Sequence, residues 1–504
     1  MPITQTDALF GLIKSLNKSE KRNFKLFANR LSSHEELKFI QLFVILDKMK
    51  VYDETLIFNK IKRLNKLQLT NLKRHLYSQI LKSLRMIHSQ KHPEIEIREQ
   101  LDYAQILYDR GLFIQSLRLL ERIKPLTTVT NQHILYLEIL EFEKLIEARH
   151  ITRSRKVKNK MENLIQESTK VNQTASQMSL LSNLMLKIQG FYINFGFVKN
   201  DKDVILIKDY FQSNLPNYSI SELNFSSQIN LNLSYLWYHY ILLEFDLCAD
   251  YGIRCIRLFD SEPVMIEKDP DLYMRMLHYT LTSLYYKEDK IQFNEFYKKL
   301  DAFYKRKHNG FNTTSKLLYY SYGLNAKMNY SLLHHDFQKC LLLVPEIKKE
   351  IEKFDDYVDP HRHIIYYYKI AWIYFIQDKL SLALDYITKI VRDKNNYLRD
   401  DLYLYARLMQ LLIHFELGHD ALVGSLMLSI QRQAQLLNDN NQIINLILNY
   451  IRLTIKDPSK DNLENASIMQ NKLTKLRVDR FEKRVFIYFD FVFWAQQKVN
   501  KLNV

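Results

Sequence analysis

The scarcity of glycine and proline limits the fold of this chain more than any other feature. Only 9 Gly and 9 Pro occur in 504 residues, well below their usual frequencies of about 7% and 5%. These residues supply the backbone angles of tight turns and of glycine-rich phosphate-binding loops. Long stretches instead space apolar residues three and four positions apart, which is the period of an amphipathic helix. The sequence therefore predicts an all-α protein.

Chain length, the distribution of apolar residues and cysteine usage further restrict which class of protein this chain can belong to. A chain of 504 residues is too long for one compact core, which favours several domains or an extended helical array. No window contains the ~18 apolar residues of a membrane span, and the first residues lack the pattern of a secretory signal. The sparse cysteines Cys248, Cys255 and Cys340 match no zinc spacing and indicate buried free thiols. We therefore expect a cytoplasmic protein that does not contact a membrane.

The segment Tyr367–Val391 shows two short amphipathic stripes separated by the polar residues 377–379. The first stripe consists of Ile364, Tyr368, Ala371, Trp372 and Phe375, and the second of Ala383, Ile387 and Ile390. Two such helices joined by about three polar residues form a helical hairpin.

This hairpin resembles the tetratricopeptide repeat, in which a small residue on each helix lets the two backbones approach closely. Ala371 and Ala383 occupy those two positions, Tyr374 matches the aromatic position, and Asp378 stands where a turn glycine is usual. The segment Leu101–Leu126 fits the same pattern. Its matching residues are Ala104, Leu107, Gly111, Ser116 and Leu120, with Pro125 expected to close the unit. The resemblance implies a right-handed superhelix of αα-hairpins.

Further polar breaks continue the series. They lie near residues 287–290, 334–336 and 418–420, with weaker ones near His150, Asn200 and Asp246. Neighbouring breaks are roughly 40 to 46 residues apart, longer than the 34-residue period of the resembled family. We therefore predict longer, divergent hairpins over residues 93–480. The aromatic stretch Phe481–Trp494 is expected to form a helix that caps the array, within a final segment 481–504.

Residues 1–92 do not follow the hairpin pattern and read as a small basic helical module. They carry 10 of the 16 net positive charges up to residue 90, which points to an anionic partner. Ser19 is expected to cap a helix that contains the sequence FKLFANRL. Further helices are expected over residues 35–49, 54–64 and 67–89, before a boundary at Pro93.

The helix over residues 67–89 has one apolar and one polar face. Its core face is expected to contain Leu69, Leu72, Leu76, Ile80 and Ile87, and the opposite face Asn71, Arg74, Ser78, Lys82 and Arg85. A shorter helix precedes it, an order that is similar to a helix-turn-helix. Arg and Asn can bind base edges, and Lys and Ser can bind phosphates. The alternative is a solvated basic face without a nucleic-acid partner.

Tyrosines recur on the predicted first helices of the hairpins. In the resembled family the first helices line a concave groove that binds peptides, so the candidate groove residues are Tyr285, Tyr319, Tyr322, Tyr367 and Tyr403. Tyr suits such a surface because it combines a large apolar ring with one polar end. Consecutive aromatic residues point in different directions on a helix, so core packing is the alternative for each of them.

Motifs of known catalytic or metal sites are absent from the sequence. There is no H-E-x-x-H, no Walker A loop, no G-x-G-x-x-G and no G-x-S-x-G. We therefore expect no catalytic site, no cofactor and no metal. The basic residues Lys472, Lys475, Arg477, Arg480, Lys483 and Arg484 are expected to form a charged helix face.

Two functions fit these observations best, and an enzyme with an unrecognised helical active site is a third alternative. The first is a non-enzymatic scaffold that binds a protein or peptide segment on the concave face of the array. The second is a transcription regulator in which residues 1–92 bind DNA and the helical array senses a partner. That layout resembles, in architecture alone, the peptide-sensing regulators that join a helix-turn-helix to tetratricopeptide repeats.

Overall fold

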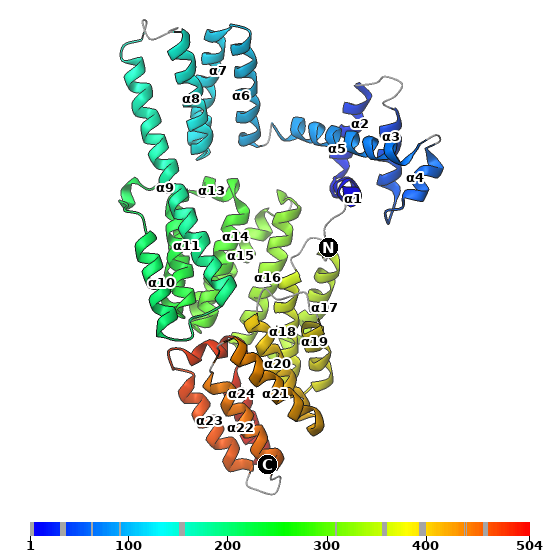
Figure 1. The fold of residues 1–504 in the computed structure, drawn as a ribbon, viewed down its shortest axis with the longest axis vertical. Helices are drawn as coiled ribbons and strands as arrows, with labels where there is room; N and C mark the ends of the chain where they lie inside the picture. Colours follow the sequence, from blue (N-terminus) through cyan, green and yellow to red (C-terminus); the bar gives the residue numbers. More distant parts are fainter. Residues whose placement is uncertain are drawn as a thin grey trace. The chain divides into compact units, whose positions relative to one another are not determined.

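The computed structural model describes residues 5–30, 37–61, 64–89, 92–150, 157–307, 310–354, 360–392, 400–437, 439, 441–456 and 462–503. Over these residues every regular element is a helix, and no strand is formed. The prediction of an all-α protein is therefore confirmed. The chain divides into two compact units, residues 1–175 and 176–504 (Figure 1).

The first unit begins with five helices that share a core of their own. They are α1 (Gln5–Ser15), α2 (Lys18–Arg30), α3 (Leu37–Lys48), α4 (Glu54–Lys60) and α5 (Lys66–His88). Phe24, Phe39 and Phe43 pack in this core against the apolar face of α5, which contributes Leu76 and Ile80. Leu69 and Leu72 of the predicted apolar face also pack here, whereas Ile87, expected on the same face, is not part of this core.

Side-chain caps determine where two of these helices begin. The Asn17 side chain accepts a hydrogen bond from the Glu20 N–H, and the Glu20 carboxylate accepts one from the Asn17 N–H, both at 2.9 Å. Ser19 is therefore not the cap that the sequence suggested, because Asn17 forms a reciprocal capping box two residues earlier. Asn65 and Gln68 form the same arrangement at the start of α5.

The first unit continues with three neighbouring helices and the start of a fourth. They are α6 (Pro93–Asp109), α7 (Phe113–Val129), α8 (His133–His150) and α9 (Lys160–Phe195), and the division between the units falls within α9. Pro93 opens α6 as expected, but Pro125 does not close α7, which continues for one more turn. Ile123 and Thr127 on either side of the proline are buried, so tertiary packing holds that last turn in place.

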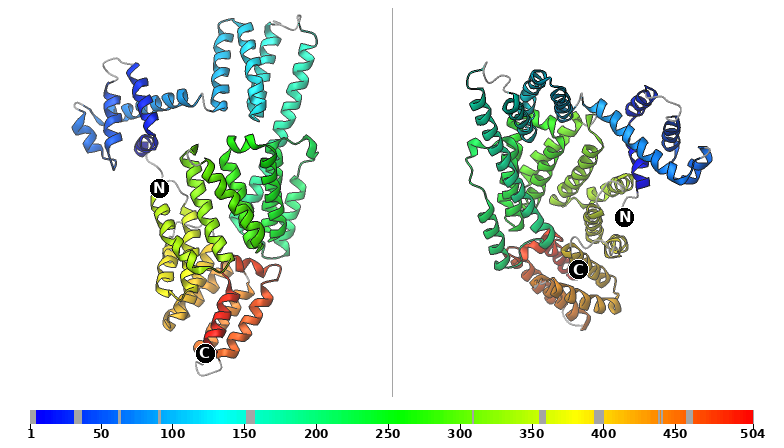
Figure 2. Two further views of the ribbon diagram at one scale, coloured as in Figure 1. Left: turned by 180° about the vertical axis from the view of Figure 1, so that it is seen from behind. Right: turned by 45° about the horizontal axis from the view of Figure 1, so that its top comes forward.

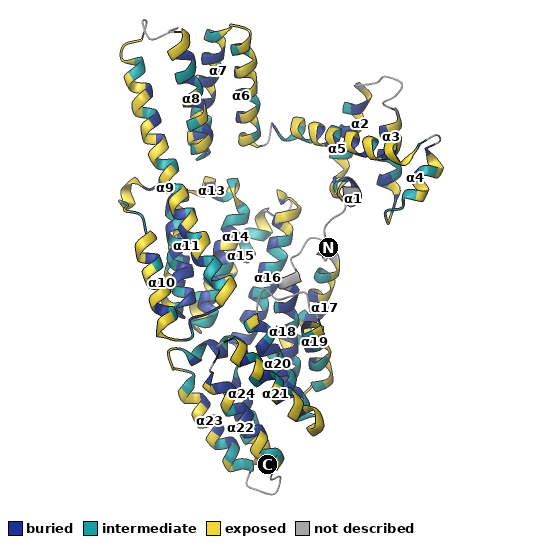
Figure 3. Ribbon diagram, viewed as in Figure 1, coloured by how far each residue is buried: buried dark blue, intermediate teal, exposed yellow. Residues whose placement is uncertain are grey.

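The second unit contains the remaining helices in chain order. They are α10 (Asp201–Asn214), η1 (Ile220–Glu222), α11 (Phe225–Ile241), α12 (Phe245–Ser261), α13 (Pro263–Lys268), α14 (Pro270–Tyr286), α15 (Lys290–Lys307), α16 (Thr313–Leu333), α17 (Phe337–Phe354), α18 (Pro360–Ile376), α19 (Leu380–Arg392), α20 (Asp400–Glu416), α21 (Asp420–Leu436), α22 (Gln442–Lys456), α23 (Asn462–Leu476), η3 (Glu482–Ile487) and α24 (Phe491–Leu502). Consecutive helices pack against each other, as two further views show for α16 to α21 (Figure 2). Their buried residues lie on the faces that they turn toward one another (Figure 3).

Seven helix junctions in the described parts of the chain share one turn geometry. Each has three residues between the helices, and the middle one has a positive φ; these middle residues are Gly111, Asn131, Leu243, Glu288, His335, Asp378 and Gly418. At each junction the N–H that follows the middle residue donates to a carbonyl five residues earlier, as Lys379 does to Tyr374 at 2.9 Å. This is the Schellman arrangement, which satisfies carbonyls that a helix end leaves unpaired. The predicted breaks at 287–290, 334–336, 377–379 and 418–420 all fall on such turns.

Paired helices contact each other through residues that are twelve positions apart in the sequence. Ala371 and Ala383 are both fully buried there, as predicted. At the equivalent position of α7 the Ser116 hydroxyl donates to the Ala104 carbonyl at 2.8 Å. The Cys248 thiol meets the Leu236 carbonyl at 3.5 Å in the same way. A small residue at this position therefore brings a side chain of the second helix onto the backbone of the first.

All three cysteines are free and buried, as the sequence indicated. Burial raises the pKa of the Cys255 thiol to about 12 and that of the Cys340 thiol to about 12. A thiol with a raised pKa is a poor nucleophile and a poor metal ligand near neutral pH. These residues therefore serve as packing groups.

The final segment does not form the single helix that was expected over Phe481–Trp494. Residues 482–487 form the 3₁₀ helix η3, residues 488–490 belong to no helix, and α24 begins at Phe491. The Asp490 side chain accepts a hydrogen bond from the Phe493 N–H at 3.0 Å and so caps α24. The apolar period is continuous in the sequence, but the cap at Asp490 breaks the helix in two.

Candidate ligand cavity

A cavity of about 530 Å³ lies among the first helices of the pairs in the second unit. α11, α14, α16 and α18 supply most of its lining, together with the end of α9 and the returning segment at Ile487 and Tyr488. Half of the lining residues are aromatic. Its aromatic residues are Tyr192, Trp237, Tyr240, His278, Tyr279, Tyr285, Tyr286, Tyr322, Tyr366, Tyr368, Trp372 and Tyr488.

Lys369 is the one cation among the described residues that line this cavity. Its ammonium group donates to the side-chain oxygens of Asn325 and Asn329 on α16, the second at 2.6 Å. It also lies 5.9 Å from the ring centroid of Tyr285 on α14. Three helices therefore meet at this one side chain.

The surroundings of Lys369 disfavour its charged form. Burial lowers the pKa of its ammonium group from 10.5 to about 7. No carboxylate among the described residues pairs with it, and no Asp or Glu stands among those that line the cavity. A buried ammonium group without an acidic partner is unusual in a protein core, because desolvation of a charge is costly unless it is paired.

Two more hydrogen-bond donors in the lining are buried and have no partner among the described residues. They are the hydroxyl of Tyr368 and the indole N–H of Trp372, both on α18. The two side chains are only 4% and 7% exposed. Buried donors of this kind are rare, and each raises the question of an absent acceptor.

A second cavity of about 640 Å³ adjoins the first. Tyr285, Tyr286, Trp372 and Ile487 contribute to the walls of both. Its remaining lining comes largely from the turns of the helix pairs and from the segment 477–496. The two cavities are thus separated by shared side chains.

The segment 477–502 runs along the turns of the helix pairs. Arg477 pairs with Glu288 at 2.5 Å, and Lys501 pairs with Asp378 at 3.0 Å. Both acidic residues occupy the positive-φ position of a turn. The Phe493 ring stacks on His335, which holds the same position at a third turn.

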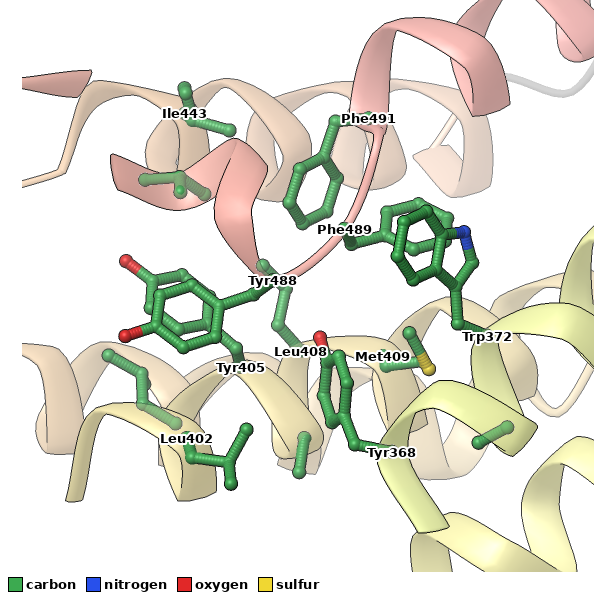
Figure 4. Close-up of a cluster of buried hydrophobic side chains, with 14 of the residues drawn as sticks. Tyr368, Trp372, Leu402, Tyr405, Leu408, Met409, Ile443, Tyr488, Phe489 and Phe491 are labelled. Carbon is green, nitrogen blue, oxygen red and sulfur yellow. The ribbon is translucent and has the colours of Figure 1, made fainter. Parts of the chain in front are cut away.

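Further contacts bind this segment to the helices themselves. Phe489 packs edge-on against Trp372 at 5.8 Å, and Tyr488 stacks on Tyr405 at 4.2 Å. Figure 4 shows Tyr488, Phe489 and Phe491 inserted among side chains of α18, α20 and α22. The predicted role as an end cap is therefore incomplete, since the segment also lies against helices far from the end of the series.

Three basic residues of this region form ion pairs with acidic residues of other parts of the chain, so the expected charged helix face is wrong for them. Arg477 pairs with Glu288, and Arg480 pairs with Asp201 at 2.9 Å. Arg484 pairs with Asp439, with side-chain exposures of 6% and 4%. Burial lowers the pKa of the Lys483 ammonium group, and the nearby Glu244 carboxylate partly opposes this shift. These partners lie far away in the sequence, so periodicity could not reveal them.

The candidate groove tyrosines fall in different places. Tyr285 and Tyr322 line the 530 Å³ cavity, where Tyr322 stacks on His278. Tyr319 instead stacks on Tyr304 of α15 at 3.4 Å. The structure therefore brings two of the five together.

The two other candidates face second helices or their own helix. Tyr367 packs against Tyr386 of α19, with Lys389 above its ring. The Tyr403 hydroxyl accepts a long hydrogen bond of 3.5 Å from Arg407. Neither lines the cavity, because consecutive aromatic residues point to different sides of a helix.

The candidate nucleic-acid face of α5 is exposed throughout. Asn71, Arg74, Ser78, Lys82 and Arg85 are all open to solvent, and Figure 3 shows the exposed surface of this helix. One of the five is already engaged, since the Arg85 guanidinium pairs with Asp102 of α6 at 2.8 Å. Whether this face binds nucleic acid stays a prediction.

Sequence reasoning missed Lys369 and its two asparagine partners. A signal was present, because Lys369 interrupts an aromatic stretch and stands one helical turn from Ile365 and Trp372, which also line the cavity. The partners Asn325 and Asn329 lie on another helix, so no local pattern joins them to the lysine.

Lys73 on α5 was also missed. It is 8% exposed on the core side of the helix. Its ammonium group pairs with Glu54 at 2.6 Å and also bonds to the Tyr52 hydroxyl. This lysine therefore belongs to the structure of the module and not to its solvent face.

Neither a metal site nor a membrane span is found among the residues that the structure describes. Within the described parts of the chain, no group of three or more His, Cys, Asp or Glu side chains could hold a metal ion. No helix in those parts is sufficiently long and apolar to cross a bilayer. The chain matches no known family model, no curated protein and no solved structure.

Proposed function

We propose that this protein is a non-enzymatic scaffold that binds a short protein or peptide segment in the aromatic cavity of its second unit. In this proposal the helix pairs are divergent hairpins of an α-solenoid similar to tetratricopeptide arrays, wound as a right-handed superhelix. The same turn at seven junctions supports this proposal, because such a recurrence is expected where one kind of helix pair is repeated along the chain. A helix pair cannot bury its apolar face alone, so repeated pairs stack on their neighbours.

The observation that carries the proposal is the cavity itself. Its volume of about 530 Å³ lies in the range of ligand sites in proteins, roughly 300–1,000 Å³. Tyr and Trp side chains dominate its walls, and these residues contribute most to recognition because they give large contact areas with few rotamers. Lys369 and the unpaired donors supply the few polar groups that such sites use to orient a ligand.

Selection from a random peptide library on the immobilised full chain tests this function. Asn325→Trp fills the cavity from α16, and Lys316→Trp adds the same bulk at an exposed site of that helix. We expect the parent and Lys316→Trp to enrich one family of peptides, and Asn325→Trp to lose it while keeping parental helicity. Thr282→Trp fills the same cavity from α14 and should behave like Asn325→Trp.

Two results would contradict the scaffold function. One is that no peptide family is enriched over the bare support. The other is that both filled variants, folded as judged by circular dichroism, still enrich the same peptides as the parent.

A second candidate function is a transcription regulator that binds DNA through α5. The exposure of Asn71, Arg74, Ser78 and Lys82 on one face favours it. Titration of the full chain with duplex DNA at several salt concentrations would show a steep loss of affinity with salt. Arg74→Gln with Lys82→Gln should weaken binding, whereas Lys48→Gln with Lys50→Gln removes the same charge from exposed sites of another helix region and should not. If both double variants lose the same amount of affinity for DNA, α5 has no special role in binding.

A further inference from the structure

We propose that the cavity around Lys369 binds a carboxylate group carried by an apolar or aromatic body. This inference rests on the proposed binding function and adds the chemical class of the ligand. The carboxylate would pair with the Lys369 ammonium group, and the apolar body would lie against the surrounding Tyr and Trp rings.

The charge balance of the cavity is the first argument. Lys369 lies in a wall without an acidic residue among those described, and its two hydrogen-bond acceptors are the neutral amides of Asn325 and Asn329. An ammonium group has three N–H donors, so one remains for a further acceptor. An anion would supply the missing charge, because a buried cation is stable only when it is paired.

The hydrogen-bond balance points the same way. The Tyr368 hydroxyl and the Trp372 N–H are buried without partners among the described residues, and they stand one residue before and three residues after Lys369 on the same helix. Both groups donate, as does the lysine. A site rich in unused donors is suited to a ligand rich in acceptors, and a carboxylate accepts at both oxygens.

The single lysine favours a carboxylate over a phosphate group. Phosphate sites usually gather several cations, arginine forks or helix N-termini. Lys369 is the only cation among the described lining residues, and aromatic rings occupy most of the remaining wall. One positive charge within an aromatic wall matches one negative charge on an apolar ligand.

Such a carboxylate could come from a small aromatic acid or from the C-terminus of a peptide. Isothermal titration of the full chain at pH 6.5 with four probes separates the two sources. The probes are 3-phenylpropionate, 3-phenylpropionamide, acetyl-Ala-Ala-Phe with a free carboxylate, and the same peptide as its amide.

We expect each carboxylate to bind at least tenfold more tightly than its amide. If the peptide acid binds at least tenfold more tightly than 3-phenylpropionate, the source is a peptide C-terminus. If the two acids bind with similar affinity, the source is a small acid.

Lys369→Met removes the charge and keeps an unbranched side chain of similar reach. It should weaken binding of the carboxylates at least tenfold and leave binding of the amides unchanged. Lys379→Met serves as a matched control, because Lys379 is exposed in the turn after α18 and should bind like the parent. Circular dichroism of both variants shows whether they keep the parental fold.

The inference is overturned if acids and amides bind equally, if no acid binds, or if folded Lys369→Met binds the acids as the parent does. In these cases the scaffold function survives when the library still enriches peptides that depend on the cavity. If the acids bind but the library enriches nothing, the scaffold function fails and the carboxylate site remains.

Discussion

Lys369 links the electrostatics of one side chain to the stability of the second unit. Burial holds its pKa at about 7, below its ordinary value of 10.5. Between these pH values the unfolded chain binds more protons at this residue than the folded chain does. The contribution of Lys369 to stability therefore rises with pH from about 7 toward 10.5.

Replacement of Lys369 should change how stability depends on pH. We expect Lys369→Met to be at least as stable as the parent at pH 7, because it removes a buried unpaired charge. The parent should gain stability between pH 7 and pH 9 through this residue, and the variant should lack that gain. Urea unfolding at both pH values measures the difference, with Lys379→Met as the control. If the free energy of unfolding changes equally between pH 7 and pH 9 in the parent and in Lys369→Met, Lys369 is not buried as described.

The sequence located some cavity residues and could not select among others. Tyr285 and Tyr322 were expected to face a groove, and both line the cavity. Tyr319 and Tyr367 were equally eligible by spacing, but they pack against second helices. Which side of an aromatic helix meets the cavity depends on the neighbouring helices, and the spacing of residues along one helix does not contain that information.

Among the helices, the close approach of α18 and α19 depends on two alanines. Ala371 and Ala383 are fully buried where the helices meet. Ala383→Leu should force them apart and cost about 1–3 kcal/mol. Ser381→Leu adds the same side chain at an exposed position of α19 and should have little effect. Thermal unfolding of both variants tests this, and an unchanged Tm for Ala383→Leu would contradict the assigned contact.

The turn between α20 and α21 tests the shared junction geometry. Gly418 has a φ of +71°, and a Cβ there would meet no atom within 4 Å. Any loss on substitution must therefore come from the backbone. Gly418→Val should cost about 1–3 kcal/mol, because β-branched residues strongly disfavour positive φ. Gly418→Asn should cost less, since asparagine tolerates this region. Chemical unfolding measures the stability of both variants. Equal losses of stability would contradict the positive φ of residue 418.

Most junctions between helices could be predicted from the sequence, although glycine is rare. Polar residues marked the breaks at His335 and Asp378, which adopt positive φ in place of glycine, whereas the turn at Asn131 was not predicted. The break near residue 489 could not be predicted, because the apolar period runs through it. A side-chain cap at Asp490 and distant packing partners decide the structure there.

At the scale of the whole second unit, the segment 477–502 joins turns that are far apart in the chain. The pair Arg484–Asp439 is its most buried ion pair among those described. Arg484→Met leaves the Asp439 charge buried without a partner, which should cost about 3–5 kcal/mol. The double variant Arg484→Met with Asp439→Leu should recover much of that loss. Arg480→Met breaks an exposed pair and should change stability by less than about 1 kcal/mol.

These unfolding experiments also test the placement of the segment. A small effect of Arg484→Met, similar to that of Arg480→Met, would mean that residues 484 and 439 do not meet in the protein.

The all-α class followed from composition and from the spacing of apolar residues alone. The path of this segment did not, since its contacts with Glu288 and Asp378 span 189 and 123 residues of sequence.

Hydrogen–deuterium exchange of the full chain, with and without a peptide that it selects, tests most directly whether the cavity is the binding site. On addition of the peptide we predict slower exchange in α14, α16 and α18, whose side chains surround Lys369, and unchanged exchange in α1 to α5. Protection confined to α1 to α5, or a bound peptide that leaves α14, α16 and α18 unprotected, would contradict this account.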